Sequence, residues 1–132
     1  PASRGAPGSV AGHCVLEDDV IVGGLSGVHQ WVRIGRGAMI GAVTMVTADV
    51  IPYGLVQGPR GQVDGLNLIG LKRRGAGRAD VLALRQLLAA LSGGSLRETA
   101  RERAAGRVSA MEREVLDFIL APSERSFLTP QA

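Results

Sequence analysis

The sequence predicts a parallel β-helix built from hexapeptide repeats, followed by a small α-helical domain. An aliphatic residue recurs every six positions from Val10 to Val46, and this period stops after Ile51. Beyond residue 77 the apolar residues recur at helical spacing instead. Of the 132 residues, 19 are glycine, which is about twice the ordinary share of ~7%. Because 45% of the residues are hydrophobic, the chain is not a low-complexity linker.

The six-residue repeat is formed by seven consecutive aliphatic residues: Val10, Leu16, Val22, Val28, Ile34, Ile40 and Val46. This period fits neither the turn of an α-helix nor the alternation of a single strand. It is typical of short strands joined by tight corners, where glycine provides positive φ or close backbone approach. The residue four places later is always small or aliphatic, so Cys14 is expected to be a buried structural thiol.

The repeat supplies only about two and a third triangular coils, whereas a stable solenoid usually needs about three repeating units. Six residues before Val10, the position where the repeat requires an aliphatic residue holds Arg4. Residues 1–9 are therefore expected not to match the repeat. An uncapped end would leave strand edges unpaired. We therefore expect residues 10–51 to be the later coils of a longer β-helix.

Residues 52–76 carry six glycines and two prolines and are expected to form an extended linking loop. Residues 77–132 are expected to form the helical domain. Asp80 to Leu91 has the apolar spacing of an amphipathic helix. Capping boxes at Ser95 and Ser109 predict helices over about 95–105 and 109–120. The segment after Pro122 is expected to be frayed or packed as coil.

Composition excludes several classes of protein. One cysteine rules out an internal disulfide framework and a cysteine-rich zinc site. Four aromatic residues are too few for a stacking platform for single-stranded nucleic acid. No signal peptide and no membrane span are expected, so the chain is expected to be soluble and cytoplasmic. The basic excess lies after residue 51, with 12 bases against eight acids.

The residues capable of chemistry are few, and each has an ordinary alternative. His13 and His29 fall outside the inward positions, so each is a candidate base or a simple surface residue. Two histidines and one cysteine do not make a metal site. The arginines of Lys72-Arg73-Arg74 suit a diphosphate, although such a run is usually solvated. Gly12 could offer an N–H to an oxyanion or could be a corner glycine.

Several motifs occur together in a specific order. They are Gly12-His13, Gly23-Gly24, Val28-His29-Gln30, Ile34-Gly35, Pro52-Tyr53, Gln57-Gly58, Gly65-Leu66-Asn67 and Gly70-Leu71-Lys72-Arg73-Arg74-Gly75. Their spacing resembles the C-terminal half of the acyl-carrier-protein–UDP-N-acetylglucosamine O-acyltransferase family of lipid A biosynthesis. The match runs from about Val10 to Leu120. The resemblance implies a left-handed parallel β-helix, a helical domain and a homotrimer.

The resemblance also implies an activity and the residues that serve it. Family members transfer a 3-hydroxyacyl group from acyl carrier protein to the 3-hydroxyl of UDP-N-acetylglucosamine, with the acyl thioester as donor and no metal or other cofactor. Carried over, Gly12 would be the oxyanion donor and Ala42 would limit acyl-chain length. The remaining matched residues would contact substrate: His13, Gly24, His29, Gln30, Asn67, Arg73 and Arg74.

Two departures from the family pattern qualify this interpretation. Ile69 stands where the family commonly has an acidic residue, two places after Asn67. The family's general-base histidine, in a His-x-x-His-Asp segment, has no counterpart in this sequence. Very low activity is therefore expected of these residues alone, since base catalysis contributes roughly 10²–10⁴-fold. The alternatives are an N-acyltransferase acting on an amino-sugar nucleotide and a catalytically silent module that trimerises or binds a UDP-sugar.

Overall fold

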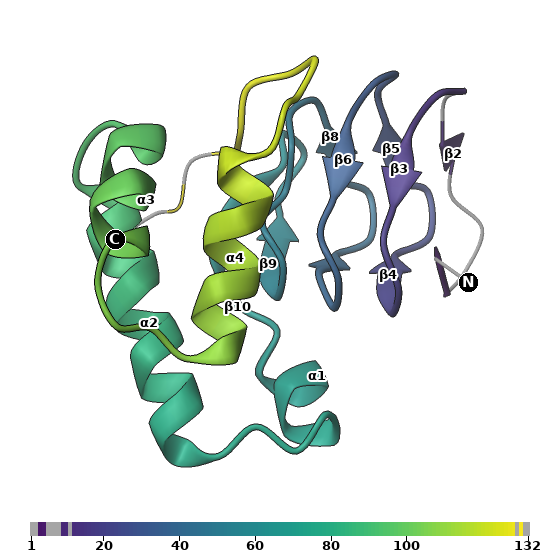
Figure 1. Ribbon diagram of the computed structural model, residues 1–132. Coiled ribbons are helices and arrows are strands. Elements are labelled where there is room, and N and C mark those ends of the chain that lie inside the picture. The colour runs from purple at the N-terminus through teal and green to yellow at the C-terminus, as the bar shows by residue number, and fades with distance from the viewer. Residues whose placement is uncertain (1–2, 5–8, 11, 129, 131–132) are drawn as a thin grey trace.

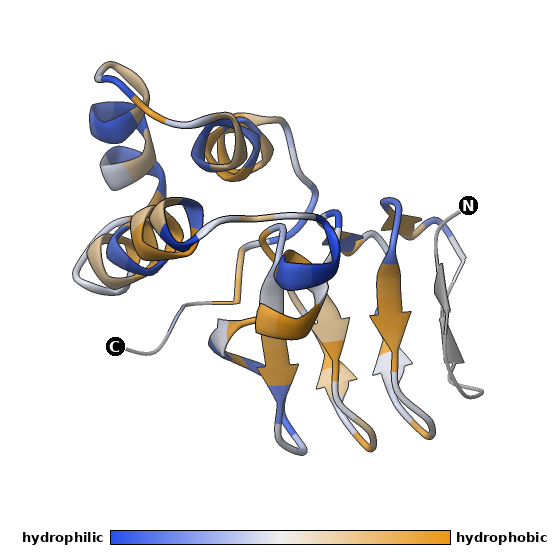
Figure 2. Cartoon of the chain, turned by 90° about the horizontal axis from the view of Figure 1, so that it is seen from below, coloured by the Kyte–Doolittle hydropathy of each residue, from blue (hydrophilic) through white to orange (hydrophobic). Residues whose placement is uncertain are grey.

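The computed structural model describes residues 3–4, 9–10, 12–128 and 130 of the chain. A stack of short strands lies beside a group of helices, and α4 is drawn between α2 and the strands (Figure 1). Hydrophobic residues concentrate on the strands and alternate with hydrophilic ones around the helices (Figure 2). None of the helices within these ranges is long and apolar enough to cross a membrane.

The strands form a three-sided parallel coil. They are β1 (Ser3–Arg4), β2 (Ser9–Val10), β3 (Val15–Leu16), β4 (Val20–Val22), β5 (Gly27–Val28), β6 (Arg33–Ile34), β7 (Met39–Ile40) and β8 (Met45–Val46). Each of β1 to β5 pairs in parallel with the third strand after it, as in the pairs Val15↔Arg33, Ile21↔Met39 and Gly27↔Met45. One turn of the coil therefore takes 18 residues, or three hexads, and the pairs lie in three separate sheets.

The repeat positions face the inside of the coil as the sequence predicts. Val22, Val28, Ile34, Ile40 and Val46 are all buried, as is the residue two positions before each of them. Upstream, β1 pairs with β4 and β2 pairs with β5, so parallel pairing extends into residues 1–9, the segment expected not to match the repeat.

Six successive corners of the coil each contain one residue with positive φ, and these residues recur every six positions: His13, Asp19, Leu25, Trp31, Gly37 and Val43. Only one of them is glycine. The five that are not glycine are exposed, and Leu25 is 83% exposed. The repeat glycines provide close approach instead: a Cβ on Gly23 would lie 2.6 Å from the backbone nitrogen of Ala42, and one on Gly35 would lie 2.4 Å from that of Pro52.

Residues 52–76 are not the extended linking loop that their glycine content predicts. They form β9 (Gly54–Gln57), β10 (Gln62–Leu66) and the short helix α1 (Leu68–Arg73). β9 extends the coil in parallel from β7, and β10 turns back antiparallel to β9. The glycines were misleading because they serve the hairpin turn and close packing, as at Gly58, which has positive φ.

The three predicted helices are present. They are α2 (Arg78–Ser92), α3 (Leu96–Ala104) and α4 (Ala110–Leu120). The capping box at Ser109 is complete, with hydrogen bonds in both directions between Ser109 and Glu112. At Ser95 the cap consists of one bond, which the Ser95 side chain accepts from Glu98 N. The segment after α4 is packed as coil. It is joined to the rest of the chain by two isolated parallel β-bridges, between Asp49 and Phe127 and between Val63 and Pro130.

Candidate functional site

The candidate residues of the coil itself lie on its outer edges, where corners that are 18 residues apart stack on each other. The corner at 12–13 stacks with the corner at 30–31 on one edge. Gly24 and Ala42 belong to a second edge, and the corners at 18–19 and 36–37 form the third. The sequence-predicted residues are thus divided into separate groups on one copy of the chain.

His13 and Trp31 form a stacked pair on the first edge. Their ring centroids are 4.7 Å apart and the ring planes differ by 10°. Both side chains are exposed, as expected for His13. They line a cavity of 430 Å³ whose opposite wall is formed by Pro122, Ser123 and Glu124. The sequence did not single out Trp31, although its corner position 18 residues after His13 predicts such a contact.

His29 and Gln30 expose their side chains beside this pair. Their backbone carbonyls are in use: the Cys14 thiol donates to His29 O at 3.0 Å, and Arg125 Nε donates to Gln30 O at 2.9 Å. The Cys14 side chain is only partly buried, which is less than predicted, and it lies against the core. Gly12 is exposed, with no heavy atom within 4 Å of a built Cβ.

Gly24 and Ala42 occupy corners on the second edge. The Gly24 carbonyl accepts a hydrogen bond from Val43 N at 2.9 Å, which joins the two corners directly. Ala42 is exposed, so its methyl group points away from the coil core. A larger residue at position 42 would therefore extend into the space outside this edge.

Asn67 is buried and serves mainly to orient α1. Its Oδ1 accepts from Gly70 N at 3.1 Å, and its Nδ2 donates to Gly37 O at 3.0 Å. The first bond caps α1 and the second fixes the helix to a coil corner. Asn67 thus determines where the basic end of α1, with Arg73, is placed.

The two arginines at the end of α1 differ in their surroundings. Both line a cavity of 420 Å³ together with Asp19, Gly37 and Asn67. Arg74 Nη1 forms an ion pair of 2.6 Å with Asp19 Oδ2, and its guanidinium carbon lies 5.6 Å from the centroid of the Tyr53 ring. Arg73 is exposed and has no ion-pair partner within the described part of the chain. Sequence reasoning missed Asp19, which reaches Arg74 from 55 residues away.

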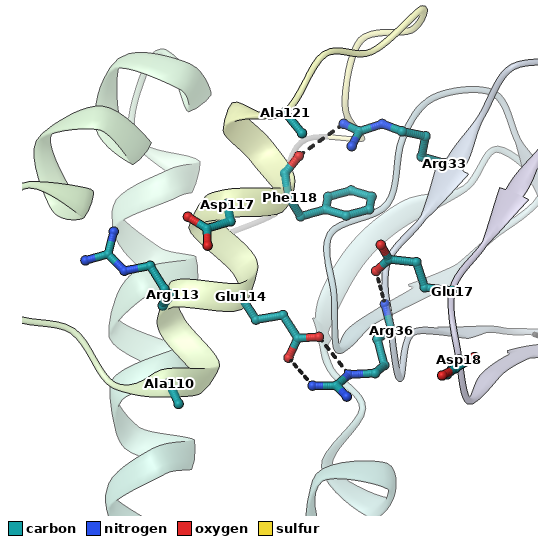
Figure 3. Close-up of a pocket in the computed structure, with 10 residues that line it drawn as sticks. All are labelled: Glu17, Asp18, Arg33, Arg36, Ala110, Arg113, Glu114, Asp117, Phe118 and Ala121. Carbon is teal, nitrogen blue, oxygen red and sulfur yellow. Dashed lines mark hydrogen bonds and ion pairs between the residues drawn. The ribbon is translucent and has the colours of Figure 1, made fainter.

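A larger cleft of 820 Å³ lies between the coil and α4, but it is lined by none of the predicted site residues. Three of its polar residues, Glu17, Arg36 and Glu114, are linked by hydrogen bonds and an ion pair (Figure 3). Arg36 Nη2 donates to Glu114 Oε1 at 2.8 Å, and its Nε lies 2.7 Å from Oε2. Arg36 N also donates to Glu17 at 2.9 Å. We interpret this cleft as the polar junction between the coil and α4.

Tyr53 extends this junction into the core. Its side chain is buried and its hydroxyl donates to Glu114. Burial raises the pKa of Tyr53 above its usual value, and the hydrogen bond to Glu114 raises it further. The same carboxylate raises the pKa of Arg36, so this arginine stays charged. The guanidinium of Arg74 lies over the ring of this buried tyrosine.

A groove between α1 and α2 combines apolar and basic residues. Its volume is 610 Å³, and its lining contains Lys72, Arg78 and Arg85 but no acidic residue. Two exposed leucines, Leu68 and Leu82, are among its apolar lining residues. Within the described residues, no group of three or more His, Cys, Asp or Glu side chains is arranged to hold a metal ion.

Comparison with known families gives a direct match to the helical part and the end of the coil. The model of the family described as UDP N-acetylglucosamine O-acyltransferase, domain 2, matches residues 49–128. This chain belongs to the UDP N-acetylglucosamine O-acyltransferase family. The resemblance inferred from the glycine, histidine and arginine motifs is thereby confirmed.

Similar full-length proteins extend the match across the coil. An acyl-[acyl-carrier-protein]–UDP-N-acetylglucosamine O-acyltransferase of Paracoccus denitrificans is 76% identical over 122 residues, which are 92% of this chain and 47% of that protein. The protein of the same name from Agrobacterium fabrum is 38% identical over 133 residues, covering 92% of this chain and 46% of its own length. The chain thus spans about half the length of these relatives.

Solved structures share the fold. The UDP-N-acetylglucosamine acyltransferase of Campylobacter jejuni superposes with a TM-score of 0.88 at 30% identity, covering 96% of this chain and 50% of that one. The Francisella novicida enzyme has a TM-score of 0.84 at 28% identity, covering 94% and 46%. The arrangement of coil, hairpin and helices is therefore that of these acyltransferases.

Proposed function

We propose that this chain is the nucleotide-binding and acyl-binding half of an enzyme that transfers a 3-hydroxyacyl group from acyl carrier protein to the 3-hydroxyl of UDP-N-acetylglucosamine. The observation that carries this proposal is the cavity beside Arg73 and Arg74, fixed to the coil by Asn67, in a member of this family. Arginine forks suit the two phosphates of a sugar nucleotide. No metal or further cofactor is needed for acyl transfer from a thioester.

In this proposal the other residues act on the sugar and the acyl group. The Gly12 N–H stabilises the oxyanion that forms on the thioester carbonyl, while His13, Gly24, His29 and Gln30 contact the substrate. Ala42 leaves space for a long acyl chain. A sugar hydroxyl needs a base to remove its proton, and none of the matched residues is the family's general base. We therefore expect very low transferase activity from these 132 residues alone.

We further propose a left-handed β-helix that assembles as a homotrimer. The coil superposes on acyltransferases of known structure, which supports that handedness. The cavity lined by His13 and the cavity lined by Arg73 have no lining residue in common. In the proposed trimer, neighbouring copies contribute one set each to a shared site, as a cyclic oligomer allows.

Acyl carrier protein is the proposed donor partner, and its chemistry fits the groove between α1 and α2. An acidic protein is attracted by Lys72, Arg78 and Arg85, while exposed leucines provide apolar contact. This attraction must weaken as the salt concentration rises. Because both proposed substrates are soluble, we place the reaction in the cytoplasm.

Calorimetry with UDP-N-acetylglucosamine tests the nucleotide site. We expect binding to the wild-type chain and at least about tenfold weaker binding to Arg73→Ala, as for the loss of a charged hydrogen bond. Arg101→Ala, which removes an exposed arginine on α3, is the matched control. Equal affinity of the Arg73→Ala and wild-type chains would contradict the phosphate assignment.

Two alternatives are separated by related measurements. The first alternative is tested with a full-length relative to which both sugar nucleotides are offered in parallel. An N-acyltransferase would prefer the 3-amino form over the 3-hydroxy form. A silent assembly module would form trimers in sedimentation experiments and yet bind neither nucleotide. The cavity beside Arg73 favours binding over assembly alone, since two arginines and Asn67 line it.

A further inference from the structure

The cavity at the third edge of the coil contains its own negative charge. Asp19 occupies the corner that stacks with Gly37, and both residues line the cavity with Arg73 and Arg74. The Asp19 carboxylate is 2.6 Å from Nη1 of Arg74. An incoming phosphate therefore meets a guanidinium that already has an anionic partner.

The ion pair holds Arg74 without enclosing it. The Arg74 side chain is 20% exposed and that of Asp19 is 68% exposed, so the pair is open to solvent on the aspartate side. The guanidinium also lies near the buried Tyr53 ring. Only Nη1 is engaged by the carboxylate, and a guanidinium has five N–H donors. Other donors of Arg74 remain for a second anion, at the cost of repulsion from Asp19.

We propose that Asp19 is an internal counter-ion that competes with phosphate groups for Arg74 and so sets the anion affinity of this cavity. In its presence Arg73 is the principal phosphate-binding arginine, and Arg74 is kept oriented but partly neutralised. The inference rests on the proposed function, because it takes a phosphoanion as the ligand of this cavity. The consequence for function concerns product release. Because Asp19 competes with the phosphate groups for Arg74, the site releases a charged product more readily.

The substitution Asp19→Asn separates charge from structure. Asp19 has a φ of 62°, and asparagine tolerates this left-handed conformation at least as well as aspartate. The amide oxygen still accepts from Arg74, so its orientation is retained. Only the negative charge is removed, and a change in anion affinity then reports electrostatic competition.

The probe is inorganic pyrophosphate, titrated by calorimetry at low ionic strength. We expect Asp19→Asn to bind it roughly three- to ten-fold more tightly than wild type, the scale of a partly screened charge interaction acting on a multivalent anion. The matched control is Asp18→Asn, which changes the net charge equally at a side chain that lines the cleft beside α4 (Figure 3). The control is expected to change affinity by less than about twofold.

The proposal is overturned by no gain in Asp19→Asn, by an equal gain in Asp18→Asn, or by no pyrophosphate binding in any variant. A gain that persists in Asp19→Asn/Arg74→Ala would also overturn it, because Arg74 must mediate the effect. Parallel titrations with UDP-N-acetylglucosamine and uridine test the proposed function independently of the counter-ion proposal. If the sugar nucleotide binds no better than pyrophosphate while Asp19→Asn still gains, the proposed function fails and the counter-ion stands.

Discussion

The fully buried carboxylate of Asp49 accepts hydrogen bonds from both the backbone nitrogen and the guanidinium of Arg33, at 2.9 and 3.0 Å. Arg33 also donates to the Phe118 carbonyl at 3.1 Å and lies 4.2 Å from the centroid of that ring. Asp49 in turn accepts from the Ser123 hydroxyl. One ion pair therefore joins the coil, α4 and the segment that follows it.

Asp49→Asn is expected to destabilise the chain by about 3 kcal/mol, because breaking a buried pair leaves the Arg33 charge without compensation. Denaturation by urea, followed by circular dichroism, measures the loss. Asp64→Asn, at an exposed position of β10, is the control and should change stability by less than about 0.5 kcal/mol. A loss below about 1 kcal/mol in Asp49→Asn would show that the pair contributes little.

Tyr53 should titrate above the usual tyrosine pKa of about 10, because burial and the Glu114 carboxylate both favour its neutral form. It is the single tyrosine, so tyrosinate absorbance reports it alone. A group whose pKa is raised by folding stabilises the fold fully below its unfolded pKa. That contribution is lost as the pH rises through the folded pKa.

The free energy of unfolding should therefore decrease from about pH 10 upward in wild type. Tyr53→Phe, which cannot ionise, should show a shallower decrease. Glu114→Gln should bring the tyrosine pKa closer to its usual value, leaving burial as the remaining cause. Titration of Tyr53 at the ordinary pKa in folded wild type would contradict the described hydrogen bond.

Asn67→Ala is expected to cost about 1–2 kcal/mol through the lost cap of α1 and the lost bond to Gly37. Asn67→Asp keeps the capping acceptor but places a buried carboxylate oxygen against the Gly37 carbonyl, so its loss should be at least as large. Both should also weaken nucleotide binding, because α1 carries Arg73. Gln62→Ala, exposed on β10, controls for truncation of a polar side chain. Unchanged stability and binding in Asn67→Ala would refute this role.

Gly35→Ala should destabilise the coil by about 1–3 kcal/mol, since its Cβ would lie 2.4 Å from the Pro52 nitrogen. Gly65→Ala offers the comparison, because no heavy atom lies within 4 Å of its built Cβ. Thermal melts of the two variants give the contrast. Equal melting temperatures would mean that the corner relaxes freely around the added methyl group.

Local patterns predicted the periodic parts of the fold and little of what connects them. The hexads predicted the parallel coil because each aliphatic residue faces the same interior, and the spacing of Leu84, Leu88 and Leu91 predicted α2. Residues 52–76 were misassigned, since glycine content does not distinguish a loop from a tight hairpin.

The candidate site was predictable only where a motif identified it. His13 and Arg73 belong to such motifs, whereas Asp19 and Glu114 reach their partners across 55 and 78 residues. Contacts at that separation depend on how the coil turns and where α4 lies. No pattern of neighbouring residues specifies either of these.

The Asp49–Ser123 contact also has a consequence for biosynthesis. Ser123 follows Asp49 by 74 residues, which a ribosome adds in about 4–15 s at ordinary rates of elongation. During that interval the coil corner at Asp49 lacks both Ser123 and the helix that receives Arg33. The Asp49 carboxylate and the Arg33 guanidinium thus lack these two partners until α4 and the segment after it have been synthesised.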